Sequence, residues 1–199
     1  VINIDSMASF SISGTSSSFT NNGSIVLHGI PGVTASTTIL DSTVDSFTNS
    51  SSGIISGTGT WMLDNLTDNG SISIGSSPGS FTLDGDLTKG ASSSFQVELA
   101  GLEAGIDYDQ LVVTGTAKIA GKLNVSLLKD FQPTAGSNFL VLVAGVLAGS
   151  FGEANGLDVS DSIVLDISLV NDNVELVGVE VDQAGSAGHD IITGTAALP

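Results

Sequence analysis

The chain has 199 residues, of which 41% are hydrophobic, and this fraction excludes an intrinsically disordered protein. Its 4 basic residues, all Lys, oppose 21 Asp and Glu, and the resulting net charge of −17 argues against binding to nucleic acid, which needs clustered cations. Because there is no Cys, the sequence also excludes a disulfide framework and a thiolate metal site.

The composition also limits the shape of the core. Only 5% of the residues are aromatic and 25 are Gly, so Val, Ile, Leu and Ala must fill the interior in thin, regularly turned layers. Such layers favour a solenoid or a sandwich over a thick globule. The longest apolar run, residues 139–147, is too short to span a bilayer, and we therefore predict no membrane insertion.

The chain begins directly in a predicted strand. Val1-Ile2-Asn3-Ile4 alternates apolar and polar residues, and nothing precedes it as a cap. Since the chain begins with neither Met nor a signal peptide, we interpret Val1 as a processed or excised start. We predict that these four residues add to a strand edge of another copy, so that the chain associates with itself as a homo-oligomer or, preferably, a filament.

An irregular repeat follows. An apolar residue, a Thr, a polar turn and a return to strand recur at Phe19, Phe47, Leu66 and Leu87, at spacings of 28, 19 and 21 residues. Such periods without helices indicate stacked coils, and we predict that the four apolar residues stack in register along one buried face. The Asn-Asn-Gly and Asp-Asn-Gly turns are expected to supply the positive φ of sharp corners.

Alternating strands continue to the end of the predicted domain. Short strands separated by Gly, Ser and Asp turns are expected at residues 81–83, 95–99, 111–113 and 123–127. Residues 138–144 are continuously apolar, which predicts a strand buried on both sides. Residues 162–170 and 174–181 are expected to pair as a hairpin across Asn171-Asp172-Asn173.

Several motifs in residues 77–155 occur together in a specific order. SPGSFTLDGDL is followed by YDQLVVTGTAKIAGKLNVSLL, FQPTAGSNFLVLVAG and GSFGEANG. This segment resembles the C-terminal solenoid region of secreted bacterial proteins with autotransporter-associated β-strand repeats. The resemblance implies a right-handed parallel β-helix and a secreted or cell-surface location, and it carries over no catalytic residue.

The predicted fold class is therefore all-β. We expect a right-handed parallel β-helix, or β-solenoid, with a C-terminal hairpin over residues 1–181, followed by a Gly/Ala-rich linker and tail over residues 182–199. The alternative is an antiparallel β-sandwich, in which the recurring turns would be ordinary hairpin turns.

Three groups of acidic residues suggest Ca²⁺, which prefers oxygen ligands. The tail around Asp190 resembles one unit of the glycine- and aspartate-rich nonapeptide calcium repeat of exported bacterial proteins, although Thr195 replaces its second glycine and one unit supplies half a site. Asp84 and Asp86 flank Gly85, and Asp107 and Asp109 flank Tyr108; alternation in a strand would point each pair to one side. Both pairs also fit plain solvated turns.

No residue pattern indicates catalysis. His28 and His189 are widely separated and no G-x-S-x-G elbow accompanies them, so we predict that the chain is not an enzyme. The predicted function is that of an extracellular structural or adhesive protein that self-associates into fibres or a surface layer. The alternative is a carbohydrate-binding or polysaccharide-processing β-helix with surface glycans as partners, for which Trp61 and Tyr108 would have to offer exposed rings.

Overall fold

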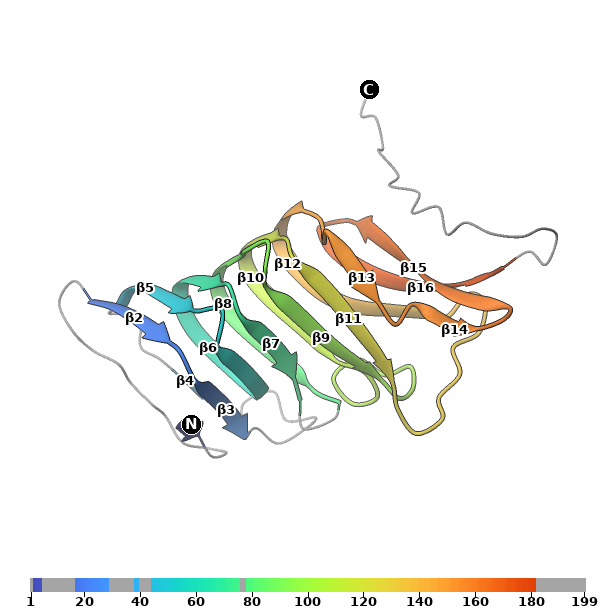
Figure 1. Ribbon diagram of the computed structural model, residues 1–199, viewed down its shortest axis with the longest axis horizontal. Helices are drawn as coiled ribbons and strands as arrows, with labels where there is room; N and C mark the ends of the chain where they lie inside the picture. The colour runs from blue at the N-terminus through green and yellow to red at the C-terminus, as the bar shows by residue number, and fades with distance from the viewer. Residues whose placement is uncertain (1, 5–16, 29–37, 40–43, 76–77, 182–199) are drawn as a thin grey trace, which may run out of the picture.

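The computed structural model describes residues 2–4, 17–28, 38–39, 44–75 and 78–181. All sixteen elements of this part are β-strands, and they belong to one curled sheet of mixed parallel and antiparallel pairing (Figure 1). The prediction of an all-β protein is thereby confirmed. The tail that contains Asp190 and the first residue, Val1, lie outside the described residues.

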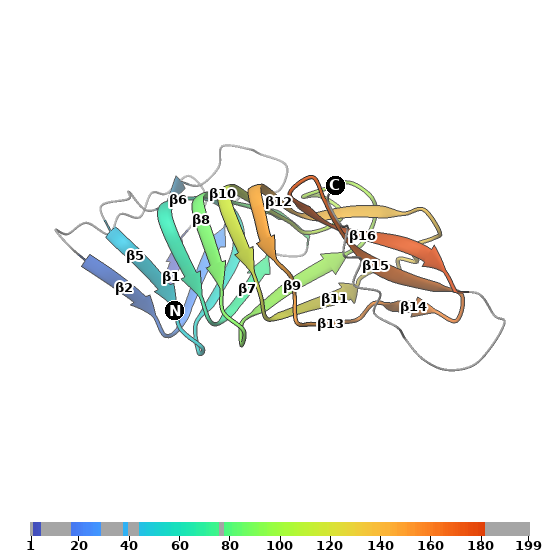
Figure 2. The same ribbon diagram turned by 90° about the horizontal axis from the view of Figure 1, so that it is seen from above.

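Most strands stand in two rows that we call the first and second walls, and the chain passes from the second to the first at a row of turns, the corner (Figure 2). The first wall contains β1 (Ile2–Ile4), β3 (Ser24–His28), the start of β6 (Ile54–Asp68), β7 (Ser71–Ile74), β9 (Ser94–Leu99), β11 (Lys122–Leu127) and β13 (Glu153–Asn155). The second wall contains β2 (Ser17–Asn21), β4 (Thr38–Ile39), β5 (Val44–Asn49), the rest of β6, β8 (Ser80–Lys89), β10 (Gln110–Ile119) and β12 (Asn138–Gly149). Pairing within both walls is parallel.

The four repeat residues stack as the sequence predicts. Phe19 pairs with Phe47, Phe47 with Leu66, and Leu66 with Leu87, each one strand further along the second wall. Phe47 is completely buried, and Leu66 and Leu87 are each only 1% exposed. The predicted register is confirmed for all four residues and the predicted burial for three of them, since Phe19 is only partly buried. The repeat period therefore corresponds to the distance along the chain from one stacked strand to the next.

The C-terminal end has antiparallel pairing. β12 pairs with β16 (Asn173–Glu180), β16 with β15 (Ile163–Val170), and β15 with β14 (Asp158–Ser160). Asn171 and Asp172 join the two long strands with φ of 49° and 62°, the conformation that a two-residue hairpin turn requires. The predicted hairpin is confirmed. An antiparallel sandwich is wrong for the rest of the described residues, because the strands from β1 to β13 pair with one another in parallel.

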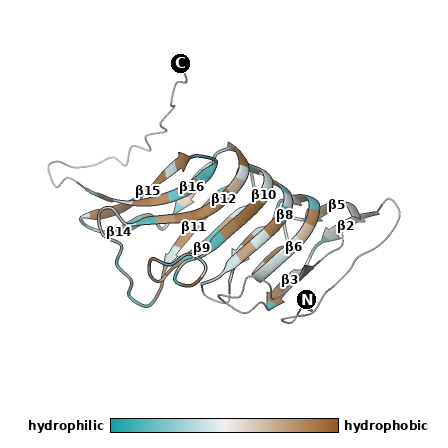
Figure 3. Ribbon diagram, turned by 180° about the vertical axis from the view of Figure 1, so that it is seen from behind, coloured by the Kyte–Doolittle hydropathy of each residue, from teal (hydrophilic) through white to brown (hydrophobic). Residues whose placement is uncertain are grey.

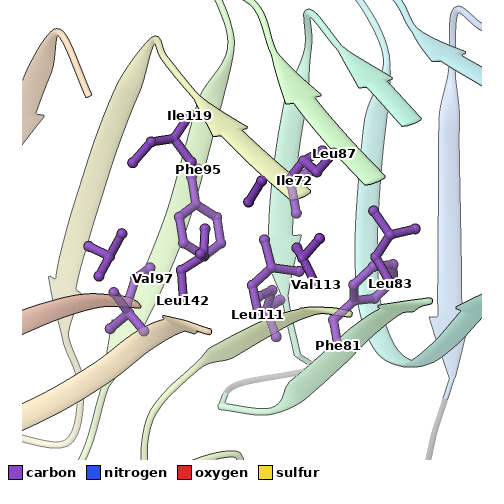
Figure 4. Close-up of a cluster of buried hydrophobic side chains, with 14 of the residues drawn as sticks. Ile72, Phe81, Leu83, Leu87, Phe95, Val97, Leu111, Val113, Ile119 and Leu142 are labelled. Carbon is purple, nitrogen blue, oxygen red and sulfur yellow. The ribbon is translucent and has the colours of Figure 1, made fainter. Parts of the chain in front are cut away.

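Alternating side chains form the core between the walls. In β9 and β8, residues such as Phe95, Val97, Phe81 and Leu83 point inward and pack against one another, while their neighbours point outward (Figure 4). The hydropathy colouring shows the same alternation along the strands (Figure 3). Polar and apolar residues therefore segregate to opposite faces of each wall, as a period of two dictates.

The strand at residues 138–144 differs from its prediction. Phe139, Val141 and Leu142 are fully buried, whereas Leu140 and Val143 are partly exposed. The register with β16 shifts between Leu140 and Leu142, and such a bulge turns two successive side chains to the same side. The strand is therefore buried on one face, and the prediction of burial on both faces is wrong.

The glycines of the repeat turns also differ from expectation. Neither Gly23 nor Gly70 has a positive φ, so the predicted role of these turns in supplying one is wrong. A Cβ placed on Gly70 would lie 2.2 Å from the carbonyl oxygen of Gly53, and one on Gly53 would lie 2.1 Å from Asn49 Oδ1. Gly53 and Gly70 are needed because neighbouring backbone and side-chain atoms approach too closely for a side chain, whereas a Cβ on Gly23 would meet nothing within 4 Å.

A column of irregularities crosses the second wall. The register shifts between Met62 and Asn65 where β6 meets β8, and between Val113 and Thr116 where β10 meets β12. Gly85 lies in this column with φ of 150°, and a Cβ there would lie 1.7 Å from the carbonyl oxygen of Leu63. The two register shifts lie at the same height of the second wall. The strand pairs are in regular register on either side of this height.

Candidate functional site

A ladder of buried polar side chains runs along the corner, and we call it the polar ladder. It consists of Asn21, Asn49, Asp68 and Lys89, which are the last residues of β2, β5, β6 and β8. Asn21 Nδ2 donates to Asn49 Oδ1 at 2.8 Å, and Asn49 Nδ2 donates to Asp68 Oδ1 at 2.7 Å. Lys89 completes the series by donating to Asp68 Oδ2 at 2.5 Å. Side chains that would be costly to bury singly thus satisfy one another.

The charged end of the polar ladder is sealed from water. The side chains of Asp68 and Lys89 are both 0% exposed. Asp68 Oδ1 also accepts from the Gly70 amide at 3.1 Å, and Lys89 Nζ also donates to the Ser94 carbonyl at 3.3 Å. Burial lowers the pKa of Lys89, and the adjacent Asp68 carboxylate partly opposes that change. Because burying a charge is costly, each of the two side chains depends on the other as its partner.

The polar ladder was missed by the sequence predictions, although the repeat contains its signal. In each repeat the residue two positions after the apolar anchor is Asn21, Asn49, Asp68 or Lys89. The repeat places these residues in its polar turns, and a polar residue beside Gly or Ser is common in turns. Their recurrence at one repeat position is the feature that indicates stacking on each other.

Asp84 and Asp86 each bind the neighbouring strand β10. Asp84 Oδ1 accepts from the Thr114 hydroxyl at 2.7 Å, and Asp86 Oδ1 accepts from the Thr116 amide at 2.6 Å. Both side chains are exposed. These contacts hold the bend of β8 against the bend of β10, so the pair has a structural role whether or not it binds a cation.

Asp109 occupies a different environment from the other predicted ligands. It is 1% exposed, and its two carboxylate oxygens accept from the backbone amides of Gly79 and Glu98, each at 2.8 Å. Burial raises the pKa of Asp109 to about 7, against the opposing effect of the two amide donors. The carboxyl group therefore ties the start of β8 to β9 at the end of the wall away from the corner.

The other residues of this turn are also engaged. Asp107 Oδ2 accepts from the Glu103 amide at 3.4 Å, and the Tyr108 hydroxyl accepts from the Leu140 amide at 3.2 Å. Asp107 is half-buried, whereas Asp109 lies beneath the surface. The two carboxylates thus have separate partners.

The raised pKa of Asp109 predicts a pH dependence of stability. Between its unfolded pKa near 3.8 and its folded pKa near 7, the folded chain binds the proton more tightly, so stability falls as pH rises through this range. From pH 6 to pH 8 the loss should be about 1.4 kcal/mol. Urea unfolding at both pH values measures it, with Asp109→Asn as the variant in which the loss should disappear. An equal loss in that variant would assign the titration to another group.

The described residues contain no group of three or more His, Cys, Asp or Glu side chains that could hold a metal ion. Ca²⁺ binding at Asp84, Asp86, Asp107, Asp109 and Asp190 stays a prediction, and Asp190 lies outside the described residues. We expect millimolar Ca²⁺ to raise the thermal midpoint or promote association, because −17 charges repel one another. Na⁺ at matched ionic strength is the control, and Asp190→Ala is the variant to compare. Equal effects of the two cations would mean screening alone.

Neither ring considered for a sugar platform is at the surface. Trp61 is 0% exposed and stacks edge-on between Phe47 and Phe81, at centroid distances of 5.3 and 5.6 Å. Tyr108 is 5% exposed and packs edge-on against Phe139. The alternative function would need exposed rings, and Trp61 and Tyr108 do not supply them, because both belong to the core.

No family model matches the chain, and a comparison with curated proteins finds no similar sequence. No helix in the described ranges is long and apolar enough to cross a membrane. What the chain does is therefore inferred from its own residues.

Proposed function

We propose that this chain is a β-solenoid segment, a right-handed parallel β-helix closed by a hairpin, of an extracellular structural or adhesive protein of a bacterial surface. It acts by associating with copies of itself into fibres or a surface layer and has no catalytic role. The parallel pairing of successive coils in both walls supports the solenoid. The acidic, cysteine-free composition suits a soluble surface outside the cell.

The proposal of self-association rests on the open edges of the first wall. Among the described residues, β1 pairs with β3 alone and β13 pairs with β11 alone, so each has an edge without a partner strand. Such edges are templates for another strand. Parallel addition of β1 of one copy to β13 of the next would continue the first wall and propagate head to tail.

Exposed apolar side chains at the C-terminal end provide a second reason for association. Leu169 and Val170 at the end of β15, Val179 in β16 and Val181 just after it are between 39% and 47% exposed. Leu169 and Val170 lie at the turn of the β15–β16 hairpin, whereas Val179 and Val181 lie at its open end, so they offer two small apolar contacts to other molecules and not one patch. Both ends of the described structure therefore offer surfaces to a neighbouring copy.

Deletion of residues 1–5 tests the connector. We expect the shortened protein to remain folded but to lose its assemblies, because the strand that adds to the next copy is gone. Light scattering and negative-stain microscopy measure the assemblies, and circular dichroism checks the fold. Asn3→Pro is a second variant of full length that removes one backbone donor from β1.

Deletion of residues 182–199 is the matched control and should leave the assemblies unchanged. If the chain without residues 1–5 forms the same particles as the full chain, β1 is not the connector. If the full chain is a monomer at every concentration tested, the proposed self-association is wrong.

A further inference from the structure

We propose that Lys89 and Asp68 condense into an amide cross-link between β8 and β6, with release of one water molecule. The two residues are direct partners in the parallel register of these strands. Lys89 Nζ donates to Asp68 Oδ2 at 2.5 Å, so the nitrogen lies beside the carboxyl group whose carbon it would attack. Holding the two groups side by side turns their reaction into an intramolecular one.

The other carboxylate oxygen of Asp68 has the donors that the reaction requires. Asn49 Nδ2 lies 2.7 Å and the Gly70 amide 3.1 Å from Oδ1. When the amine attacks the carboxyl carbon, negative charge develops on Oδ1, and these two N–H groups stabilise it as an oxyanion hole does. Oδ2 lies beside the amine and becomes the leaving oxygen.

The atoms balance without any further reagent. In the first step the ammonium of Lys89 gives a proton to Oδ2 of Asp68, which leaves a neutral amine and a carboxylic acid. Burial lowers the pKa of Lys89 and so favours the neutral amine. The nitrogen lone pair then forms the N–C bond, and one nitrogen proton moves to Oδ2. The C–Oδ2 bond breaks, Oδ2 leaves as water, and the carbonyl to Oδ1 re-forms.

Burial separates this pair from ordinary salt bridges. Both side chains are 0% exposed, so water is kept away from the product and hydrolysis is slow. The pair Lys122–Glu153 has a similar distance, 2.7 Å, but its side chains are 48% and 49% exposed. It has the same chemical groups without the dry site, and it is therefore an internal control that should not react.

Mass spectrometry of the full chain under denaturing conditions tests the cross-link. We expect the purified folded protein to be lighter than its sequence by the mass of one water. A protease that cleaves after Lys should fail at the acylated Lys89 and release residues 1–118 as one fragment, one water short, while still cleaving after Lys122. Chain recovered unfolded in denaturant should have the full mass and should lose the water only after refolding.

Two variants show which groups act. Lys89→Met removes the amine and should keep the full mass. If this variant does not fold, the double variant Lys89→Met with Asp68→Leu replaces both charges by apolar groups and should also keep the full mass. Asn49→Ala should slow the loss of water in the refolded chain by about 100-fold, as expected for one oxyanion donor. Full sequence mass in the folded wild type after prolonged incubation, with cleavage after Lys89, would overturn the proposal, and the pair would then be an ion pair only.

Discussion

Phe47→Ala is expected to lower the free energy of unfolding by about 3–5 kcal/mol. The ring is completely buried and lies between Phe19 and Trp61, at centroid distances of 4.9 and 5.3 Å. Because successive strands of the wall hold its neighbours in register, they cannot move in to fill the cavity. Urea unfolding followed by circular dichroism measures the loss.

Phe19→Ala is the matched control. Phe19 occupies the same repeat position one strand nearer the N-terminus, but it is only partly buried. Its removal should cost less than half as much as that of Phe47. A loss below about 1 kcal/mol for Phe47→Ala would place that residue outside the core, since truncation of a buried Phe costs several times more.

Gly85→Val should be at least as disruptive, lowering the free energy of unfolding by about 3–5 kcal/mol. At φ of 150° the backbone is unfavourable for a residue with a side chain, and the new Cβ would meet the Leu63 carbonyl oxygen at 1.7 Å. To relieve this contact β8 must move away from β6, which breaks ladder hydrogen bonds at the centre of the wall. Thermal and urea unfolding both report the change.

Gly23→Ala provides the comparison for this effect. A Cβ on Gly23 would meet nothing within 4 Å, and its φ is not in the left-handed region. We expect a change within about 1 kcal/mol, and a slight stabilisation is consistent with fewer conformations of the unfolded chain. If both variants lose the same stability, close backbone approach at Gly85 is not the cause.

The fold was largely accessible from the sequence because its signals are local. Alternation predicts several of the strands, such as those at residues 95–99 and 123–127, and the repeat at Phe47 and Leu66 predicts which strands stack. The turn at Asn171-Asp172 predicts the hairpin. The role of the glycines could not be predicted in the same way. Gly53 and Gly70 are required by close contacts with backbone atoms of Asn21 and Gly53, which are far from them in the sequence.

The candidate sites were less accessible, for a related reason. Sequence alone treats Asp68 and Lys89 as surface residues, because isolated charges belong in water. The stacked strands enclose both side chains at the corner, and there each is the hydrogen-bond partner of the other. Asp109 was singled out for its carboxylate, but its burial and the amides of Gly79 and Glu98 depend on how three separate segments meet.

The change from parallel to antiparallel pairing at β12 has a consequence for the order of folding. β15 and β16 are joined by two residues, whereas Leu66 and its partner Leu87 are 21 residues apart, and closing the longer loop costs more entropy. A hairpin forms in about 1–10 μs, so we expect this one to form early and to present β16 as a template for β12. The coils would then add one by one toward the N-terminus. During synthesis, however, the N-terminal strands leave the ribosome before the hairpin does, and they would wait, unpaired and extended, for a template that is made after them.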